Sequence, residues 1–566
     1  MPSPRFTCFV AACAAALSCH VSFAAPPEPA RADNAMVVTA QHLATRIGVD
    51  ILKKGGNAVD AAVAVGYALA VTYPAAGNLG GGGFMTLMLA DGRKTFIDFR
   101  ETAPLAAKAD MYLDKDGNVI EGASTSGHLA VAVPGTVAGL EYALAKYGTM
   151  KRSELIAPSI DLADKGFVLD EGDIGLFRLM GRSLRTDPAT AKIFLNAGRS
   201  FDVGDRLVQK DLANTLREIS RHGADGFYKG PVSAAIIASS RQGKGILSQA
   251  DFDQYRPREL APIECDYRGH HIVSAPPPSS GGTALCEILG VLEGYPLRDM
   301  GFHSAQAVHV QVEAMRQAYA DRNAFLGDPD FVQNPIARLL DKAYATKIRN
   351  AIAPDKAGIS AQIRPGVAPR EGSNTTHYSI MDKAGNAVSV TYTLNEWFGA
   401  RVTAEGTGVL LNDEMDDFTS KLGKPNLYGL VQGEQNRIDP GKRPLSSMTP
   451  TIVTRDGKPV MVVGTAGGSR IISTVLNVIV NVIDYGMELP EAVAAPRFHQ
   501  QWLPEPTTLE RGALGAAERE KLEAMGHRFT TSQLARHVAA ILVNRSGPRL
   551  TGVSDPGRES GLALGY

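Results

Sequence analysis

The sequence has no excess of charge of either sign. Its 58 lysines and arginines balance 59 aspartates and glutamates, which leaves a formal net charge of −1, and only 21% of residues are charged. This balance gives no indication of a nucleic-acid or other polyanionic partner. Beyond the N-terminal segment, no apolar run reaches the roughly 18–20 residues that span a bilayer. We therefore expect no membrane-spanning helix and a soluble mature protein.

Cysteine is also scarce. Three of the 5 cysteines lie in the first 24 residues, so only Cys265 and Cys286 remain in the rest of the chain. An oxidising compartment would permit a bridge between these two. Cys286, however, lies in an apolar stretch with a helical pattern, where a buried free thiol is equally compatible with the sequence. The disulfide state is left open.

The first 24 residues have the pattern of a secretory signal. Arg5 precedes an apolar stretch that ends at Leu17, and Ser22-Phe23-Ala24, with a small residue at each end, comes directly before Ala25. We expect residues 1–24 to be removed and the protein to be periplasmic or secreted.

The rest of the chain can bury a large core, because 44% of the 566 residues are hydrophobic, and its length suggests two or more structural units. Helices are predicted over 42–53 and from 58 to about 71. Residues 126–345 read as mostly helical, most strongly at 303–326. The stretch 353–374 contains proline and glycine and is expected to be an exposed linker.

Residues 77–83 are rich in glycine but lack what a phosphate-binding loop needs. No Lys-Ser/Thr pair follows them, the spacing does not fit G-x-G-x-x-G, and the run leads into a strand rather than a helix. We expect close packing of the backbone beside a site instead. No cofactor is predicted.

A β-hairpin is predicted to begin at Thr375. Residues 375–381 and 387–395 flank a turn whose Gly385 can take the left-handed conformation. A loop at 383–385 places Thr375 opposite Thr393. On the second strand, alternation predicts a core face of Val388, Val390, Tyr392 and Leu394 and a site face of Ser389, Thr391, Thr393 and Asn395.

An internal threonine can gain a base through cleavage of the chain. A threonine hydroxyl is a poor nucleophile unless a base takes its proton, and the α-amine of the same residue can do so at a chain terminus. Cleavage after Asn374 would place Thr375 there. Taken alone, a Thr-Thr pair that opens a strand is ordinary β-propensity.

Three other segments carry candidate site residues, each with two interpretations. Arg100 ends a predicted strand and is suited either to a structural ion pair or to bidentate binding of a carboxylate. The acidic sequence 412–418 lacks the spacing of an EF-hand, and it is either solvated charge or a partner for a substrate ammonium. Gly467 and Gly468 precede a predicted helix at 470–485, where free N–H groups form either a tight turn or an oxyanion hole.

Taken together, these segments resemble the γ-glutamyltranspeptidases, which are N-terminal-nucleophile hydrolases. The matching motifs follow the order of the family and span almost the whole chain after the signal. They are GNAVDAA at 56–62, GNLGGGGF at 77–84, DFRE at 98–101, TTHYS at 375–379, NDEMDDF at 412–418, PLSS at 444–447 and GGSR at 467–470.

The resemblance implies a four-layer αββα sandwich, an α/β fold of the α+β kind, with a largely helical middle region. It also implies a precursor that cuts itself into a large subunit, 25–374, and a small subunit, 375–566, which stay together as a heterodimer. In this cleavage Thr375 Oγ attacks the Asn374 carbonyl in an N-to-O acyl shift, and water hydrolyses the ester. The new α-amine, with a reference pKa of about 7.7–8.0, then serves as a base.

The implied substrates are glutathione and other γ-glutamyl compounds. Thr375 attacks the γ-carbonyl, Thr393 orients Thr375, and the N–H groups of Gly467 and Gly468 hold the oxyanion. The acyl group then passes to water or to the amine of an amino acid or dipeptide. Tyr428 resembles the lid residue of lidded members and is expected to cover the pocket.

The implied ligands of the substrate's amino-acid end form two sets. Position 414 is Glu where some bacterial members have Gln, which adds negative charge near the α-ammonium. The resemblance assigns the α-carboxylate to Arg100, Ser446 and Ser447, and the α-ammonium to Asn395, Glu414 and Asp417.

Two other functions are compatible with parts of the sequence. A cephalosporin or glutaryl acylase of the same superfamily would use the same threonine but needs no ammonium site, so Asp417 and Arg100 argue against it. A non-catalytic periplasmic binding protein would keep the fold without cutting itself. The intact Thr375, Thr393 and Gly467-Gly468 argue against that function.

Overall fold

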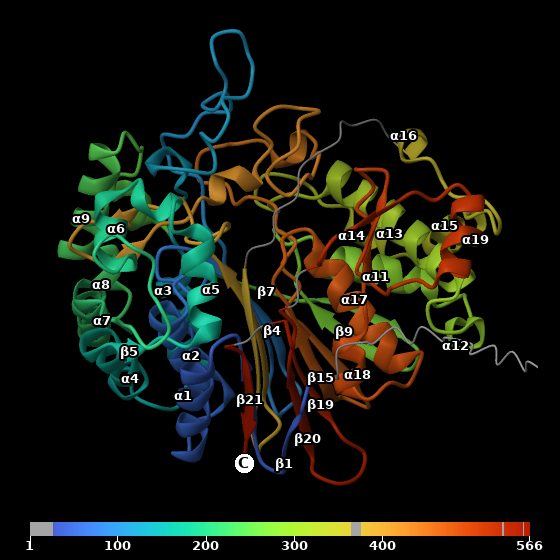
Figure 1. Ribbon diagram of the computed structural model, residues 1–566, viewed down its shortest axis with the longest axis horizontal. Helices are drawn as coiled ribbons and strands as arrows, with labels where there is room; N and C mark the ends of the chain where they lie inside the picture. Colours follow the sequence, from blue (N-terminus) through green and yellow to red (C-terminus); the bar gives the residue numbers. More distant parts are fainter. Residues whose placement is uncertain (1–26, 364–374, 535–536, 558–559) are drawn as a thin grey trace, which may run out of the picture.

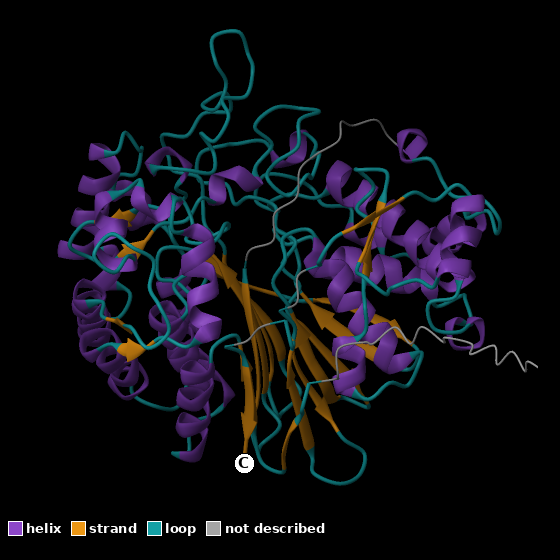
Figure 2. Cartoon of the chain, in the orientation of Figure 1, coloured by secondary structure: helices purple, strands orange, loops and turns teal. Residues whose placement is uncertain are grey.

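Two sheets of seven strands each form the centre of the molecule, and helices cover their outer faces (Figure 1, Figure 2). The computed structural model describes residues 27–363, 375–534, 537–557 and 560–566. The predicted signal, 1–24, therefore lies outside the described residues, as do Asn374 and the last part of the predicted linker.

The first sheet is antiparallel throughout and holds the predicted hairpin at its centre. Its strands run in the order β21 (Leu562–Gly565), β2 (Met36–Thr39), β10 (Thr376–Met381), β11 (Ala387–Thr393), β3 (Gly82–Met88), β4 (Lys94–Phe99) and β7 (Arg258–Leu260).

The second sheet is also antiparallel and packs face to face on the first. Its strands run in the order β1 (Ala30–Ala32), β20 (Leu550–Ser554), β19 (Ala539–Val543), β15 (Lys458–Gly464), β14 (Thr451–Arg455), β9 (His270–Ser274) and β8 (Ile263–Tyr267). Apolar side chains such as Val38 from the first sheet and Val462 from the second fill the space between them.

The register predicted for the hairpin is confirmed. Tyr378 pairs with Val390 and Ile380 pairs with Val388 in β10 and β11. Continuing this register brings Thr375 opposite Thr393, and the two hydroxyl groups lie 3.4 Å apart.

The prediction that one face of β11 is a site along its length is wrong. Val388 and Val390 belong to the core on the helix side, as predicted. On the other face, Ser389 Oγ donates to the carbonyl of Val463 in β15, 3.4 Å away. Thr391 Oγ1 is hydrogen-bonded to His377 Nδ1 in the neighbouring β10, 2.8 Å away. Because the second sheet covers this face, its polar side chains are held by hydrogen bonds within the sandwich, and the end of the strand at Thr393 reaches the pocket.

The helical layer over the first sheet is built around α2 (Ala58–Thr72). All of its residues are buried, and its small side chains let it lie close to β10 and β11. Asn57 caps its N-terminus by accepting from the N–H groups of Val59 and Asp60. The neighbouring helix α1 (His42–Lys53) has the bounds that the sequence predicts.

The helical layer over the second sheet contains α11 (Gly281–Leu292) and α17 (Arg470–Ile483), with the long α13 (Ala305–Phe325) packed on α11. Figure 1 shows these helices on the opposite side of the sheets from α1 and α2. The predicted αββα sandwich is therefore confirmed. None of the helices within the described ranges is long and apolar enough to cross a membrane.

The middle region is largely helical, as predicted, but it also supplies strands β7, β8 and β9 at 258–274. The sequence pattern missed these because they are short, and β7 and β8 are edge strands with partly exposed residues. The other helices are α3 (Thr136–Tyr147), α4 (Arg152–Lys165), α5 (Glu171–Met180), α6 (Pro188–Phe194), α7 (Lys210–His222), α8 (Asp225–Tyr228), α9 (Pro231–Gln242), α10 (Gln249–Gln254), α12 (Leu297–Met300), α14 (Ile336–Leu339), α15 (Lys342–Ala351), α16 (Ser360–Ile363), α18 (Leu489–Ala494) and α19 (Ala516–Ala524).

A disulfide joins Cys265 in β8 to Cys286 in α11. This answers the question that the sequence left open. The bridge ties an edge strand of the second sheet to the helix that covers it.

Candidate active site

The predicted site residues gather around one small pocket. Its volume is about 20 Å³, close to the room that one water molecule needs. Gly467 is the one predicted residue that does not line it. The lining consists of Arg100, Thr375, Thr393, Asn395, Glu414, Asp417, Tyr428, Ser446, Ser447 and Gly468, together with Leu430, Met448, Ser469 and Ile471.

Thr375 lies directly before β10, and its hydroxyl is held by the end of β11. Thr375 Oγ1 donates to Thr393 Oγ1 across 3.4 Å. Thr393 Oγ1 also accepts from the backbone N–H of Asn395 at 2.9 Å. Asn395 has a φ of 78°, a conformation that costs a non-glycine residue energy and is often kept at functional sites. The end of β11 thus fixes the hydroxyl that meets Thr375.

Gly467 and Gly468 form the turn between β15 and α17. Their φ angles of 139° and 56° are in the region that favours glycine. Among the described residues, no acceptor is found for the backbone N–H of either glycine. Two free N–H groups beside the N-terminus of a 14-residue helix are what a developing oxyanion needs.

Tyr428 covers this turn from the other side of the pocket. A Cβ atom on Gly468 would lie only 2.3 Å from Tyr428 Cδ1, so the ring rests directly on the glycine. The Tyr428 hydroxyl donates to Asn395 Oδ1 at 2.6 Å, and the residue is buried. The ring of Tyr428 thus lies over part of the pocket lining, and its role as a lid stays a prediction.

Arg100 forms two close, buried ion pairs with the acidic segment 412–418. Its Nη1 lies 2.5 Å from Glu414 Oε1, and its Nη2 lies 2.5 Å from Asp417 Oδ2. Its Nε donates to the carbonyl of Pro444 at 3.2 Å. The sequence allowed Arg100 either a structural ion pair or a substrate carboxylate, and the structure shows the ion pair. Its partners come from the acidic segment 412–418, which is buried rather than solvated.

Glu101 is a neighbour of this cluster that sequence reasoning did not single out. It is buried, and its carboxylate lies 3.6 Å from Arg100 Nη1. Burial raises the pKa of Glu101 to about 7, although Arg100 opposes the shift. Burial also raises the pKa of Glu414 well above its usual range. The cluster therefore holds more acid groups than its one arginine can keep ionised.

The two serines of the PLSS motif are held by hydrogen bonds at the pocket. Ser446 Oγ accepts from the N–H of Met448 at 3.1 Å. Ser447 Oγ accepts from Arg322 Nη2 at 3.2 Å. Sequence reasoning missed Arg322, although the helical period of α13 places it in line with buried Met315 and Tyr319. An arginine on the apolar face of a helix was the signal that could have found it.

Known proteins resemble the chain over nearly its full length. A family model for gamma-glutamyltranspeptidase matches residues 44–565. The chain belongs to the γ-glutamyltranspeptidase family. It is 65% identical over 564 residues to the glutathione hydrolase proenzyme of Pseudomonas sp. (strain A14), with 98% of each chain covered. It is 47% identical to the glutathione hydrolase proenzyme of Escherichia coli (strain K12), with 97% of each chain covered.

A solved structure outside the transpeptidases has the same fold. The cephalosporin acylase from Bacillus halodurans superposes with a TM-score of 0.83 at 25% identity, covering 97% of this chain and 98% of that chain. The family assignment drawn from short motifs is thus confirmed, as is the N-terminal-nucleophile hydrolase fold. Family membership also makes the protein an enzyme.

Proposed function

We propose that the protein is a γ-glutamyltransferase and glutathione hydrolase with Thr375 as its nucleophile. One observation carries this proposal. Thr375 Oγ lies 3.4 Å from Thr393 Oγ1 in a pocket that is also lined by Gly468 and by the ion-paired Arg100. A nucleophile, a free N–H group and a charged amino-acid site are the parts that transfer of a γ-glutamyl group needs.

The chain becomes active when it is cut between Asn374 and Thr375. The α-amine released on Thr375 has a reference pKa of about 7.7–8.0 and can take the proton of its own hydroxyl. Thr375 Oγ then attacks the γ-carbonyl, and the N–H groups of Gly467 and Gly468 stabilise the oxyanion. The α-ammonium returns the proton to the departing amine. The ester is resolved by water or by the amine of an amino acid or dipeptide.

The two products of this cut stay together as a heterodimer. Both halves of the chain contribute strands to both sheets, so a cut after residue 374 leaves the subunits joined by hydrogen bonds between strands. The large subunit supplies β2, β3, β4 and β7 to the first sheet and β1, β8 and β9 to the second, and the small subunit supplies the rest.

When the amino-acid end of the substrate binds, its two charges replace the ion pairs that Arg100 makes with Glu414 and Asp417. Arg100 is paired with Glu414 and Asp417, so the site has both signs of charge held together. The α-carboxylate of a γ-glutamyl group forms an ion pair with Arg100 and accepts hydrogen bonds from the hydroxyls of Ser446 and Ser447. The α-ammonium forms ion pairs with Glu414 and Asp417. A zwitterion keeps every buried charge compensated, whereas a substrate with only one of the two charges does not.

Tyr428 must move for substrate to enter, because a pocket of about 20 Å³ cannot hold a γ-glutamyl group. Its hydroxyl bonds to Asn395 Oδ1. When Tyr428 moves away, this oxygen is released and becomes an acceptor for the substrate α-ammonium. Opening of the pocket and completion of the ammonium site are therefore coupled. We place the protein in the periplasm, following the signal-like sequence at 1–24.

The competing activity is that of a glutaryl or cephalosporin acylase, since an acylase shares the fold. Turnover of a γ-glutamyl anilide is compared with turnover of the glutaryl anilide, which lacks only the α-amino group. We expect the γ-glutamyl compound to be strongly preferred. Asp417→Asn should lower its kcat/KM roughly 10- to 100-fold, the free energy of one charged hydrogen bond, and should not lower glutaryl turnover, because that substrate has no ammonium for Asp417 to bind. Equal rates for both anilides in the wild type would reject the transpeptidase assignment.

A further inference from the structure

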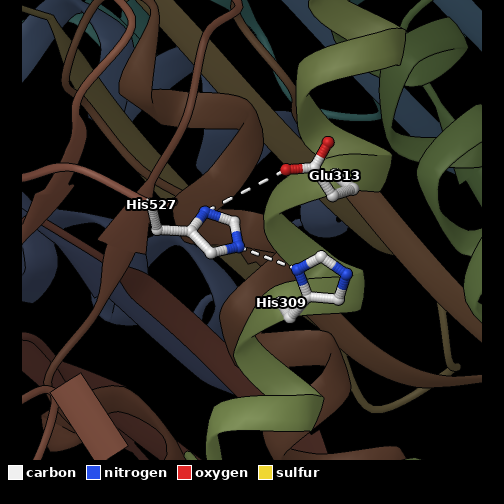
Figure 3. A group of neighbouring side chains, drawn as sticks. All are labelled: His309, Glu313 and His527. Carbon is white, nitrogen blue, oxygen red and sulfur yellow. Dashed lines mark hydrogen bonds and ion pairs between the residues drawn. The ribbon is translucent and has the colours of Figure 1, made fainter. Parts of the chain in front are cut away.

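A second cluster of ionisable side chains lies apart from the pocket, where α13 meets the loop between α19 and β18 (Phe529–Thr531). His309 and Glu313 lie one turn apart on α13, and His527 faces both of them from the loop (Figure 3). Their exposures are 0%, 7% and 4%, and none of them lines the candidate active site. The reaction proposed above uses none of the three.

The hydrogen bonds of His309 fix which of its nitrogens carries the proton. Nε2 lies 2.7 Å from the carbonyl of Ala353, which can only accept, so Nε2 carries the hydrogen. Nδ1 then has a free lone pair, and it points toward His527 Nε2 at 2.8 Å. A histidine whose second nitrogen donates to a backbone carbonyl is held in the way that metal-binding histidines are held.

The bond to His309 in turn leaves His527 with an acceptor on its far side. His527 Nε2 donates to His309, so Nδ1 carries a lone pair, and it faces Glu313 Oε1 at 4.0 Å (Figure 3). Neither His527 Nδ1 nor Glu313 Oε1 has a hydrogen-bond partner among the described residues. Two buried acceptors that face each other without a donor are unfavourable, and a cation between them removes the cost.

The surrounding charge also favours a cation. Glu313 Oε2 lies 3.3 Å from Arg316 Nε, and Arg316 Nη1 lies 2.7 Å from Glu505 Oε1. These ion pairs join two carboxylates to one guanidinium, so the three described groups together carry a net negative charge. Glu313 Oε1, on the side away from Arg316 Nε, is the oxygen that faces His527.

We propose that His309, Glu313 and His527 bind one divalent transition-metal ion of the Zn²⁺ type. Each residue offers one ligand atom, and the three atoms lie within 4.8 Å of one another. Bonds of about 2.0–2.2 Å to a tetrahedral ion place ligand atoms roughly 3.3–3.5 Å apart, so small side-chain movements suffice. When the ion binds His527 Nδ1 and Glu313 Oε1, the hydrogen bond from His527 Nε2 to His309 breaks, and the freed lone pair of His309 Nδ1 becomes the third ligand. Two imidazoles and a carboxylate suit Zn²⁺ better than Ca²⁺ or Mg²⁺.

The role of this site is structural. The ion joins α13 to the loop after α19, and the same region holds the segment that leads toward residue 374. Ala357 N donates to the carbonyl of Met525 at 2.8 Å, and His309 itself bonds to Ala353. The ion therefore fastens the last described part of the large-subunit chain to the body of the molecule, whatever the reaction at Thr375.

The test uses tag-free, full-length protein freed of metal with a chelator. Zn²⁺ binding is measured by calorimetry, and Co²⁺ binding by its visible absorbance, which reports tetrahedral coordination. We expect one ion per chain and a higher melting temperature with Zn²⁺. His527→Gln and Glu313→Gln should each weaken binding at least 10-fold and remove the thermal shift. The matched control is His222→Gln, an exposed histidine on α7 that lies near one acid, Glu218, and it should bind as the wild type does.

Two results would overturn the proposal. One is a metal-free wild type that binds neither ion and shows no thermal shift. The other is binding of unchanged stoichiometry and affinity in His527→Gln, which would place the ion elsewhere on the surface. His527 lies in a loop, so its variant remains informative if Glu313→Gln, in the middle of α13, does not fold.

Discussion

At the scale of single residues, Thr393 is the side chain that positions the hydroxyl of Thr375. Its hydroxyl meets both Thr375 Oγ1 and the N–H of Asn395. Thr393→Val keeps the shape but removes the hydroxyl, so Thr375 loses its orienting partner. We expect kcat to fall about 10²-fold for each cleaved chain with KM little changed, because a small misplacement of a reacting group has that effect. Steady-state kinetics with a γ-glutamyl anilide measures both constants.

Thr393→Ser is the matched control, since it keeps the hydroxyl and loses only a methyl group. It should retain most of the activity. A valine variant as active as the wild type would show that the hydroxyl is dispensable and would refute the positioning role of Thr393.

Glu101 predicts a pH dependence of stability. Burial raises its pKa from 4.5 to about 7, so the folded protein holds this proton more tightly than the unfolded chain does. The contribution is fully present below about pH 4.5 and is lost as the pH rises through about 7. Glu101→Gln removes this titration. Its stability relative to the wild type should therefore increase between about pH 5 and pH 8.

Midpoints of denaturant unfolding at several pH values test this, with Glu121→Gln as the control at an exposed glutamate. The control should follow the wild type at every pH. A Glu101→Gln variant whose midpoint stays parallel to that of the wild type would show that the carboxyl group does not titrate in this window.

The meeting of Thr375 and Thr393 could be predicted from the sequence because it depends only on strand period and loop length. The pairing of Arg100 with Glu414 could not, because its residues lie 314 positions apart and their contact depends on how loops pack. The sequence offered solvated charge, an ion pair or a substrate site for these residues. The structure shows the ion pair, and both partners are buried.

At the scale of elements, the disulfide between β8 and α11 is the feature with the most direct test. It closes a loop over a sequence separation of 21 residues, for which chain entropy predicts a stabilisation of about 3 kcal/mol. The double variant with Cys265→Ser and Cys286→Ala should lose about that free energy of unfolding. Denaturant unfolding with and without a reductant measures it.

The reductant serves as the internal control in that experiment. It should destabilise the wild type to the level of the double variant and leave the variant itself unchanged. Equal stability of oxidised and reduced wild type would contradict the stabilising role of the bridge.

Elements with a strong local sequence pattern could be predicted. Elements whose structure depends on packing against neighbouring elements could not. Helix α1 has a regular apolar period, and its bounds at 42–53 are those expected. The strands at 258–274 are short and lie at or next to sheet edges, so their pattern is weak. The polar face of β11 was taken for a site because alternation shows which side chains share a face. It does not show what covers that face.

At the scale of the whole molecule, the two halves of the chain are woven through the same two sheets. Cleavage before Thr375 can therefore create a new chain terminus inside the molecule without taking the molecule apart. The fold and the family are established, whereas the proposed reaction requires cleavage of the peptide bond between residues 374 and 375. The proposed base, the nucleophile and the heterodimer all follow from its cleavage.

The most direct test is therefore mass spectrometry of the N-termini of the purified protein, for the wild type and for Thr375→Ala. The account predicts two wild-type chains, one beginning near Ala25 and one beginning at Thr375, and a single inactive chain for the variant. A wild-type enzyme that is active while uncut, or a Thr375→Ala variant cut at the same bond, would contradict it.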